Sequence, residues 1–396
     1  MLEKTCKNKL RVLVTISTPG MGGIENQVLY FLEKYDHERF IVDVVCGRST
    51  DGALRDKYIA TGTQMILCRW SRYVIPYVWR MIKLLRHGQY DVVHAHSAEV
   101  SGAVMLAAKI AGVPVRIASY DHIKTHWRNP GFVNNMAVGI LQGLTRLLAT
   151  RIYGDAVACL DVFFPHWRKY PEQFQICYDG IDIARFNETI NPSEIRDEMG
   201  LPIDSLVVGH VGGFRKVKNH QTFVNVAELV SKHFENVHFL LVGDGELQQK
   251  IKLEVTNRGL KNRFVFAGNR QDVPRMLAAM DVFLMPSLDE GFGLAVAEAQ
   301  LAGLCIVASN LPGISEAMYP KMREFCCEPL DFAKMSEHVI KLLEAPELRS
   351  RIGREAREYV TNNFSIDKTV EQLENDYESL AVNTCHEKVH YSVRNP

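Results

Sequence analysis

Short apolar runs alternate with longer amphipathic stretches along most of the chain. Runs such as 40–46 (FIVDVVC), 206–211 (LVVGHV) and 237–242 (VHFLLV) are almost continuously apolar, as in parallel strands that are covered on both faces. Between such runs, apolar residues recur at helical spacing. The alternation predicts an α/β protein built on doubly wound sheets.

The predicted strands and helices follow this pattern in order. Further strands are expected at 10–17, 63–68, 91–96, 113–119, 155–160, 174–177, 264–267, 281–285 and 304–308. Helices are expected from residue 24 and at 69–86, 98–111, 135–151, 293–302, 332–343 and 347–362, with Pro76 interrupting the second of these.

Length and composition favour a two-domain cytoplasmic protein. A chain of 396 residues exceeds what one hydrophobic core usually supports. The formal net charge is zero, yet residues 1–180 hold 22 Lys and Arg against 15 Asp and Glu. A basic half favours an anionic surface or acceptor, and we expect no nucleic-acid partner. Nine cysteines without a C-x-x-C pair indicate reduced thiols, and no stretch reaches the ~18 apolar residues of a membrane span.

The strongest candidate chemistry lies at 281–309, where two apolar strands enclose a loop, a Gly-Phe-Gly turn and a helix. Glycines let the backbone turn sharply and let a ligand approach, and the helix then presents N–H groups at the positive end of its dipole. Such a site suits a phosphate or the ring oxygens of a sugar. Glu290 and Glu298 bracket it. A surface helix that carries two glutamates is the alternative interpretation.

The run P-S-x-x-E-G-F-G-L-x-x-x-E-A at 286–299 closely resembles the donor-sugar site of retaining glycosyltransferases of family 4, which have the two-domain GT-B fold. The resemblance implies that Glu290 touches the transferred sugar and that Glu298 binds the ribose hydroxyls of the nucleotide. It also implies that the sugar hydroxyls and the phosphate are held by the amides of Phe292, Gly293 and Leu294.

A second basic loop, GGFRKVKNH at 212–220, can neutralise a diphosphate leaving group without a metal, and its following helix is expected to be capped near Asn219. A solvated basic loop is the alternative. The loop resembles the family motif G-R-F-x-x-x-K-N-H, with Lys218 in register and Arg215 two places after the usual arginine. The resemblance further implies that Gly268, with Arg270 beside it, contacts the base.

The family resemblance also sets the domain boundaries. YDGIDI at 178–183 is similar to the boundary motif N-G-I-D, with Asp179 in place of asparagine. It implies an acceptor-side Rossmann-like domain at 1–180 and a donor domain at 181–365, with an interdomain cleft. Residues 366–382 carry one apolar stripe and are expected to cross back to the first domain, ahead of a polar tail at 383–396.

The loop after the first strand contains Gly20-x-Gly22-Gly23-x-Glu25. An NAD site would require an acidic residue at the end of the second strand, which ends instead in Cys46. The family has G-G-x-E here, which implies that Gly22 and Gly23 approach the donor diphosphate or the acceptor. A plain strand–helix turn is the alternative.

Two histidine motifs follow in the first half. His94 and His96 are two positions apart in one strand, so their side chains point to the same face of the sheet. They could form a metal site with His122 or His126, but no ligand spacing in the sequence supports such a site. The family resemblance implies that His122 meets the transferred sugar, with a structural histidine as the alternative. Residues 123–135 are expected to form an acceptor-binding flap.

Residues 69–86 combine five basic residues with interleaved aromatics and no acidic residue. Such a helix can lie on an anionic membrane face, or simply pack one face on the sheet. We therefore expect a possible peripheral membrane contact on the cytoplasmic side.

Taken with the resemblance, the sequence predicts a metal-independent retaining glycosyltransferase. It would move a sugar from a nucleotide donor, with UDP as the default, to a saccharide or lipid-linked acceptor in bacterial polysaccharide synthesis. The alternatives are a nucleotide-sugar 2-epimerase of the same fold and a non-catalytic nucleotide-sugar-binding subunit. A glycoside hydrolase also uses two carboxylates, but it does not need a phosphate-binding loop.

Overall fold

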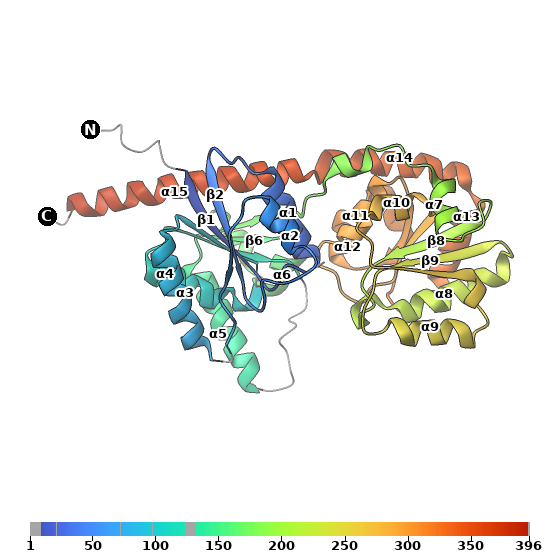
Figure 1. Ribbon diagram of the computed structural model, residues 1–396, viewed down its shortest axis with the longest axis horizontal. Helices are drawn as coiled ribbons and strands as arrows, with labels where there is room; N and C mark the ends of the chain where they lie inside the picture. Colours follow the sequence, from blue (N-terminus) through green and yellow to red (C-terminus); the bar gives the residue numbers. More distant parts are fainter. Residues whose placement is uncertain (1–8, 21, 72, 97, 123–131, 395–396) are drawn as a thin grey trace. The chain divides into compact units, whose positions relative to one another are not determined.

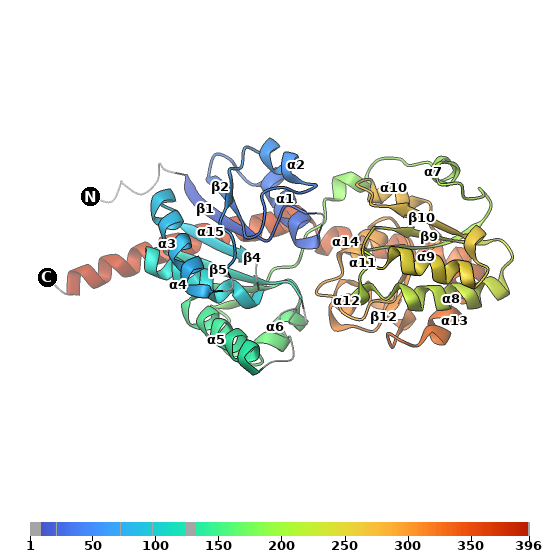
Figure 2. The same cartoon turned by 60° about the horizontal axis from the view of Figure 1, so that its bottom comes forward.

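The computed structural model describes residues 9–394 except 21, 72, 97 and 123–131 (Figures 1 and 2). Most of the predicted flap at 123–135 therefore lies outside the described residues. The chain divides into two compact units. Unit 1 comprises Met1–Gly180 with Ile366–Pro396, and unit 2 comprises Ile181–Ser365.

Unit 1 is built on a parallel sheet in the order β3-β2-β1-β4-β5-β6-β7. Because the strands are parallel, their carboxyl ends meet at one edge, where ligands bind in open α/β sheets. The strands are β1 (Leu10–Ile16), β2 (Phe40–Cys46), β3 (Met65–Leu67), β4 (Val92–His96), β5 (Val115–Tyr120), β6 (Arg151–Gly154) and β7 (Phe174–Ile176).

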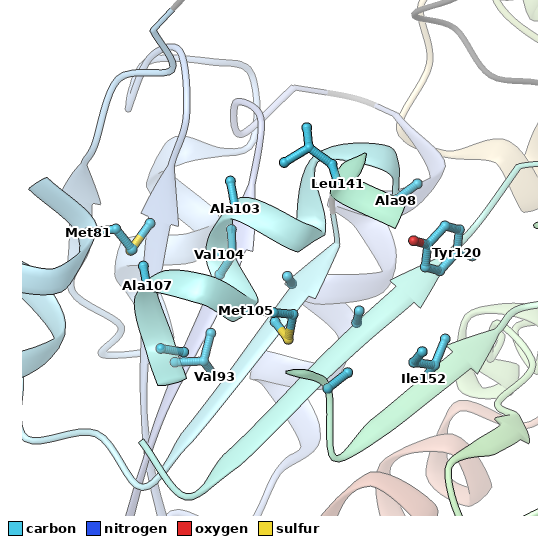
Figure 3. Close-up of a cluster of buried hydrophobic side chains, with 14 of the residues drawn as sticks. Met81, Val93, Ala98, Ala103, Val104, Met105, Ala107, Tyr120, Leu141 and Ile152 are labelled. Atoms are coloured by element: carbon cyan, nitrogen blue, oxygen red, sulfur yellow. The ribbon is translucent and has the colours of Figure 1, made fainter. Parts of the chain in front are cut away.

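Helices cover both faces of this sheet. One face packs against α3 (Val74–Gly88), α4 (Ser101–Ala111), α5 (Phe132–Leu148) and α6 (Val157–Phe163). The other packs against α1 (Gly23–Lys34), α2 (Arg55–Ala60) and α15 (Ile366–Arg394). Figure 3 shows the first layer, in which α4 lies between Met81 of α3 and Leu141 of α5. A Cβ on Gly102 of α4 would lie 1.9 Å from the Leu141 carbonyl oxygen, so the two helices pack backbone to backbone.

The C-terminal helix α15 completes the core of unit 1. Its predicted apolar stripe is confirmed, because Ile366, Val370, Leu373 and Tyr377 are all buried. The Tyr377 hydroxyl forms a hydrogen bond with His94 Nδ1 at 2.7 Å. The apolar interface between α15 and the sheet therefore contains a buried polar contact. The helix also extends to Arg394, where the sequence predicts a polar tail.

Unit 2 contains a second parallel sheet in the order β10-β9-β8-β11-β12-β13. Its strands are β8 (Leu206–Val211), β9 (Val237–Val242), β10 (Phe264–Gly268), β11 (Val282–Met285), β12 (Cys305–Ser309) and β13 (Cys326–Cys327). Its helices are α7 (Pro192–Glu198), α8 (His220–His233), α9 (Gln248–Asn257), α10 (Val273–Ala278), α11 (Leu294–Leu301), α12 (Pro312–Ala317), α13 (Phe332–Glu344) and α14 (Pro346–Asn363).

Two local predictions are wrong. The strand expected at 155–160 is instead helix α6, and β6 ends before it at Gly154. Buried Ala156, Cys159, Leu160 and Phe163 recur at helical spacing, which a continuous apolar run conceals. Pro76 also does not interrupt α3, because the helix begins at Val74 and its first turn needs no proline N–H.

Candidate functional site

Glu290 lies at the carboxyl edge of the unit 2 sheet, in the loop between β11 and α11. Its Oε1 accepts hydrogen bonds from Lys218 Nζ at 2.5 Å and from Ser287 Oγ at 2.8 Å. The Lys218 and Glu290 side chains are only 15% and 12% exposed. The structure thus places Lys218 and Glu290 in direct contact, although they lie 72 positions apart in the sequence. Both belong to the motifs that the sequence analysis identified as candidate donor-binding motifs.

One backbone hydrogen bond and one side-chain hydrogen bond hold these two loops together. The Leu288 N–H donates to the Val217 carbonyl at 2.7 Å, and Asn219 Nδ2 donates to the Pro286 carbonyl at 3.0 Å. Asn219 adopts the left-handed conformation (φ +52°), and its side chain does not cap α8, contrary to the prediction. The amide is used instead to tie the lysine loop to the glutamate loop.

The Gly-Phe-Gly turn sets the direction in which α11 begins. Gly293 has φ +83°, a conformation that favours glycine, and the helix begins at the next residue. Phe292 is 2% exposed and packs edge-on against Phe364, with ring centroids 4.9 Å apart. On the other side, a Cβ on Gly313 of α12 would lie 1.5 Å from the Gly291 carbonyl oxygen, so the turn is fixed between two elements. The first N–H groups of a helix have no partner within it, so this end suits an anion.

Glu298 lies in α11 and is partly buried. Burial raises the pKa of its carboxyl to about 7, and the nearby Arg185 guanidinium opposes this shift. The carboxyl therefore loses its proton near neutral pH. Its ionised form would accept hydrogen bonds from a diol such as ribose.

Arg215 is exposed in the loop that precedes Lys218. Its Nε lies 3.5 Å from the position that a Cβ on Gly213 would take. The side chain therefore folds back toward Gly213, where the family motif has its arginine. Among the residues that the structure describes, no carboxylate forms an ion pair with Arg215, so its charge is not neutralised within this part of the protein.

The two residues predicted to contact the base differ in what they offer. Gly268 ends β10 with φ +68°, and its carbonyl accepts from the Gly243 N–H at 2.7 Å. The Arg270 guanidinium contacts Asp272 at 2.7 Å and Glu198 at 2.9 Å, and these carboxylates raise its pKa. The Arg270 charge is thus already balanced, which leaves less of it for a ligand.

Gly22, Gly23 and His122 belong to unit 1. Gly22 precedes α1, and a Cβ there would lie 2.1 Å from Glu25 Oε2, so the glutamate side chain packs close to the glycine. His122 follows β5, and its Nδ1 bonds to Asp121 Oδ1 at 2.8 Å. All the site assignments from sequence stay predictions, since no bound ligand tests them.

The two strand histidines are part of the core. His94 is buried and bonds through Nε2 to Ser119 Oγ at 2.7 Å, while Nδ1 contacts Tyr377. Burial lowers the pKa of His96 to about 4, against the attraction of Asp121. Within the described part of the chain, no three His, Cys, Asp or Glu side chains gather closely enough to hold a metal ion.

A group of carboxylates that the sequence reading overlooked borders a cavity of unit 1. Asp121, Asp155 and Asp179 each follow the carboxyl end of a strand, β5, β6 and β7 respectively. Burial raises the pKa of both Asp155 and Asp179, and the neighbouring aspartates add to the shift. Their position directly after successive parallel strands was the available signal.

Family comparisons cover most of the chain. The family described as Glycosyl transferases group 1 matches residues 192–359, and Glycosyltransferase Family 4 matches residues 21–153. A UDP-Gal:alpha-D-GlcNAc-diphosphoundecaprenol alpha-1,3-galactosyltransferase from Escherichia coli is 26% identical over 96% of this chain and 100% of its own length. The capsular polysaccharide biosynthesis glycosyltransferase CapH of Staphylococcus aureus is 24% identical, over 78% of this chain and 83% of its own.

A structural comparison shows the same architecture. Anabaena HepE, solved in complex with UDP, superposes with a TM-score of 0.80 at 20% identity, covering 94% of this chain and 100% of its own. The WaaG glycosyltransferase superposes with a TM-score of 0.71 at 18% identity, covering 92% of this chain and 99% of its own. The predicted pair of doubly wound domains is thereby confirmed as the GT-B fold.

Proposed function

This chain belongs to family 4 of the glycosyltransferases, and we propose that it moves a hexose from UDP to a saccharide carried on a lipid diphosphate, with retention at the anomeric carbon. The observation that carries the proposal is the contact between Lys218 and Glu290 beside the start of α11. The E. coli relative, whose name includes a diphosphoundecaprenol acceptor, supports the acceptor class, and the capsular polysaccharide enzyme CapH supports a role in bacterial polysaccharide synthesis.

In this proposal, unit 2 supplies the groups that stabilise the leaving group. A lysine ammonium has three donors, so Lys218 can keep one on Glu290 while the others face a diphosphate. The amides at the start of α11 and the exposed Arg215 add positive potential. Together they stabilise the negative charge that grows on the diphosphate as the glycosidic bond breaks.

Glu290 orients the sugar in this proposal and is not a covalent nucleophile. Its Oε1 already accepts two hydrogen bonds, from Lys218 and Ser287, which fix the carboxylate plane. The other oxygen is then directed at a hydroxyl of the hexose. The diphosphate oxygen takes the proton of the acceptor hydroxyl on the same face of the ring, and the ionised Glu298 receives the ribose hydroxyls.

We propose that transfer needs no metal ion, because Lys218 and Arg215 supply the positive charge. Transfer activity in EDTA should equal that in buffer alone. A loss in EDTA that Mg²⁺ or Mn²⁺ restores would contradict this part of the proposal.

The decisive experiment compares wild type with Glu290→Gln. UDP binding is followed by calorimetry, and transfer by release of UDP from UDP-hexoses in the presence of polyprenyl-diphosphate saccharides. We expect the variant to bind UDP within about threefold of wild type but to lose transfer. Conversion of the donor sugar without an acceptor would indicate a 2-epimerase, and binding without any turnover would indicate a binding subunit.

We also propose a peripheral membrane contact through α3 at the cytoplasmic face. Tyr73, Ile75 and Trp79 are 67%, 80% and 59% exposed, while Tyr77 and Met81 are buried against the sheet. Lys83 Nζ lies 4.1 Å from the Trp79 ring centroid, which places positive charge beside the exposed apolar face. Among the described residues, no helix is long and apolar enough to cross a membrane.

Co-sedimentation with vesicles tests this contact. The wild type should sediment with vesicles that contain anionic lipid more than with zwitterionic ones. Trp79→Glu should reduce binding severalfold. Ile59→Glu is the matched control, because Ile59 is 46% exposed on α2, over the opposite face of the sheet. Equal binding by both variants would count against α3.

A further inference from the structure

A cavity of about 210 Å³ lies within unit 1, between α5 and the segment 163–174. Buried Phe163, Phe164 and Phe174 form its floor, and Trp167 and Tyr170 stand at its side. We call it the aromatic cavity. None of its lining residues is assigned above to donor binding, but the His122 ring packs edge-on against Phe163, with ring centroids 5.7 Å apart.

The α5 side of the aromatic cavity is kept open by two glycines. Gly139 and Gly143 are four residues apart and so lie on one side of the helix. A Cβ built on either meets no atom within 4 Å. Glycine inside a helix is destabilising relative to alanine. Packing does not require these glycines, and their effect is to leave the cavity free of side chains.

Two of the polar side chains that line the aromatic cavity are engaged in hydrogen bonds within the protein, and Arg146, His166 and Tyr170 line it as well. Gln142 Nε2 donates to the Phe163 carbonyl, and Trp167 Nε1 donates to Asp161 Oδ1 at 2.8 Å. Five of the lining residues are aromatic (Phe163, Phe164, Trp167, Tyr170 and Phe174), and such walls favour a hydrocarbon ligand.

The surface next to the aromatic cavity is both apolar and basic. Met136, Ile140 and Leu147 of α5 are 52%, 57% and 77% exposed and share a helical stripe with Gly143. The Arg146 guanidinium lies over the Tyr170 ring at 5.2 Å from its centroid, at the rim. An apolar pocket with a cation at its mouth is complementary to an anionic amphiphile.

We propose that the aromatic cavity binds the isoprenoid chain of the acceptor next to its diphosphate, with Arg146 facing the phosphate. The inference rests on the lipid-linked acceptor of the proposed function, and it assigns the recognition of the lipid to residues 139–174 of unit 1. Chain burial here gives the enzyme affinity for the carrier that is independent of the saccharide.

Calorimetry with farnesyl diphosphate tests the proposal on the full chain. Gly143→Leu fills the cavity and should weaken farnesyl diphosphate binding at least tenfold, equivalent to about 1.4 kcal/mol. Ala137→Leu is the matched control, because it adds the same side chain at an exposed position of α5 that does not line the cavity, and it should bind within twofold of wild type. Arg146→Met should weaken farnesyl diphosphate but leave farnesol unchanged.

Three results would overturn the proposal. One is equal affinity of Gly143→Leu and wild type for farnesyl diphosphate. Another is inorganic diphosphate binding as tightly as farnesyl diphosphate, which would leave no role for the chain. The third is equal affinity for dodecyl phosphate and farnesyl phosphate, which would remove the preference for isoprenoids. UDP affinity is measured in parallel: its absence in wild type would refute the proposed function, whereas farnesyl diphosphate binding reports on the aromatic cavity alone.

Discussion

Replacing Lys218 with methionine tests the central contact of the donor site. Methionine keeps the apolar stem but removes the ammonium group that lies 2.5 Å from Glu290 Oε1. In the variant, Ser287 Oγ still donates to the Glu290 carboxylate, but its negative charge is no longer paired with Lys218. The folded protein should therefore lose stability as well as activity.

The magnitude follows from the burial of the two side chains. A hydrogen bond to a charged group contributes about 1.5–3 kcal/mol, and a fully buried charge left without its partner costs about 3–5 kcal/mol. Lys218 and Glu290 are 15% and 12% exposed, so water still reaches the carboxylate. We expect a loss of about 1.5–3 kcal/mol in the free energy of unfolding.

Transfer should fall further than stability. Removing one preorganised donor from a developing anion costs roughly 10²–10³-fold in kcat. Lys216→Met is the matched control, because Lys216 lies in the same short helix, Lys216–Lys218, and is exposed. An exposed substitution of this kind changes stability by about 0.5 kcal/mol or less. Its transfer rate should remain within threefold of wild type.

The assays are thermal unfolding and kcat/KM from UDP release, applied to the single variants and to Lys218→Met with Glu290→Gln. The double variant removes both charges, so it should recover much of the stability lost in Lys218→Met, while transfer stays low. If the double variant also regains transfer, the pair is only a structural tie. If Lys218→Met behaves like Lys216→Met, the reasoning about the diphosphate is refuted.

Three other predictions concern single groups. The pKa of Glu298 is raised from 4.5 to about 7, so the folded protein holds its proton more tightly. The contribution of this group to the free energy of unfolding is fully present below pH 4.5 and is lost as the pH rises through 7. UDP binding should strengthen from pH 6 to 8, because the carboxyl loses its proton over this range. In calorimetry, the Glu298→Gln variant should show neither of these two pH dependences. Gly313→Ala should lower the free energy of unfolding by more than about 2 kcal/mol, because its Cβ would overlap the Gly291 carbonyl; an unchanged thermal midpoint would contradict this. Tyr377→Phe should cost about 1–2 kcal/mol, seen in urea unfolding, because it leaves buried His94 with one partner fewer.

Several buried strands were the features that the sequence predicted well. Strands β2, β8 and β9 begin and end at the predicted residues, because each is a continuous apolar run between polar turns. The contact between Lys218 and Glu290 was not predicted from the sequence, although their motifs follow β8 and β11 of the same parallel sheet. Parallel strands bring such ends to one edge.

Features that depend on packing could not be read from the sequence. Helix α6 and strand β6 share one apolar run, and only burial in three dimensions separates them. The side chain of Asn219 does not cap the backbone of α8, because its amide donates to Thr222 Oγ1 and to the Pro286 carbonyl, 67 positions away. The aromatic cavity depends on the distance between α5 and a segment about 25 residues later, which no periodicity encodes.

The place of α15 in the fold affects how the protein is made. Unit 1 takes its final helix from the last residues of the chain, and Ile366, Val370, Leu373 and Tyr377 of that helix fill the core beside α1 and β2. During synthesis on the ribosome, at ~5–20 residues per second, the 185 residues of unit 2 emerge before this helix does, a delay of roughly 10–40 s. Unit 2, which is continuous in the sequence, can therefore fold first. Until α15 is made, one apolar face of the unit 1 sheet remains exposed to chaperones. A premature stop codon near residue 365 would leave that face open permanently.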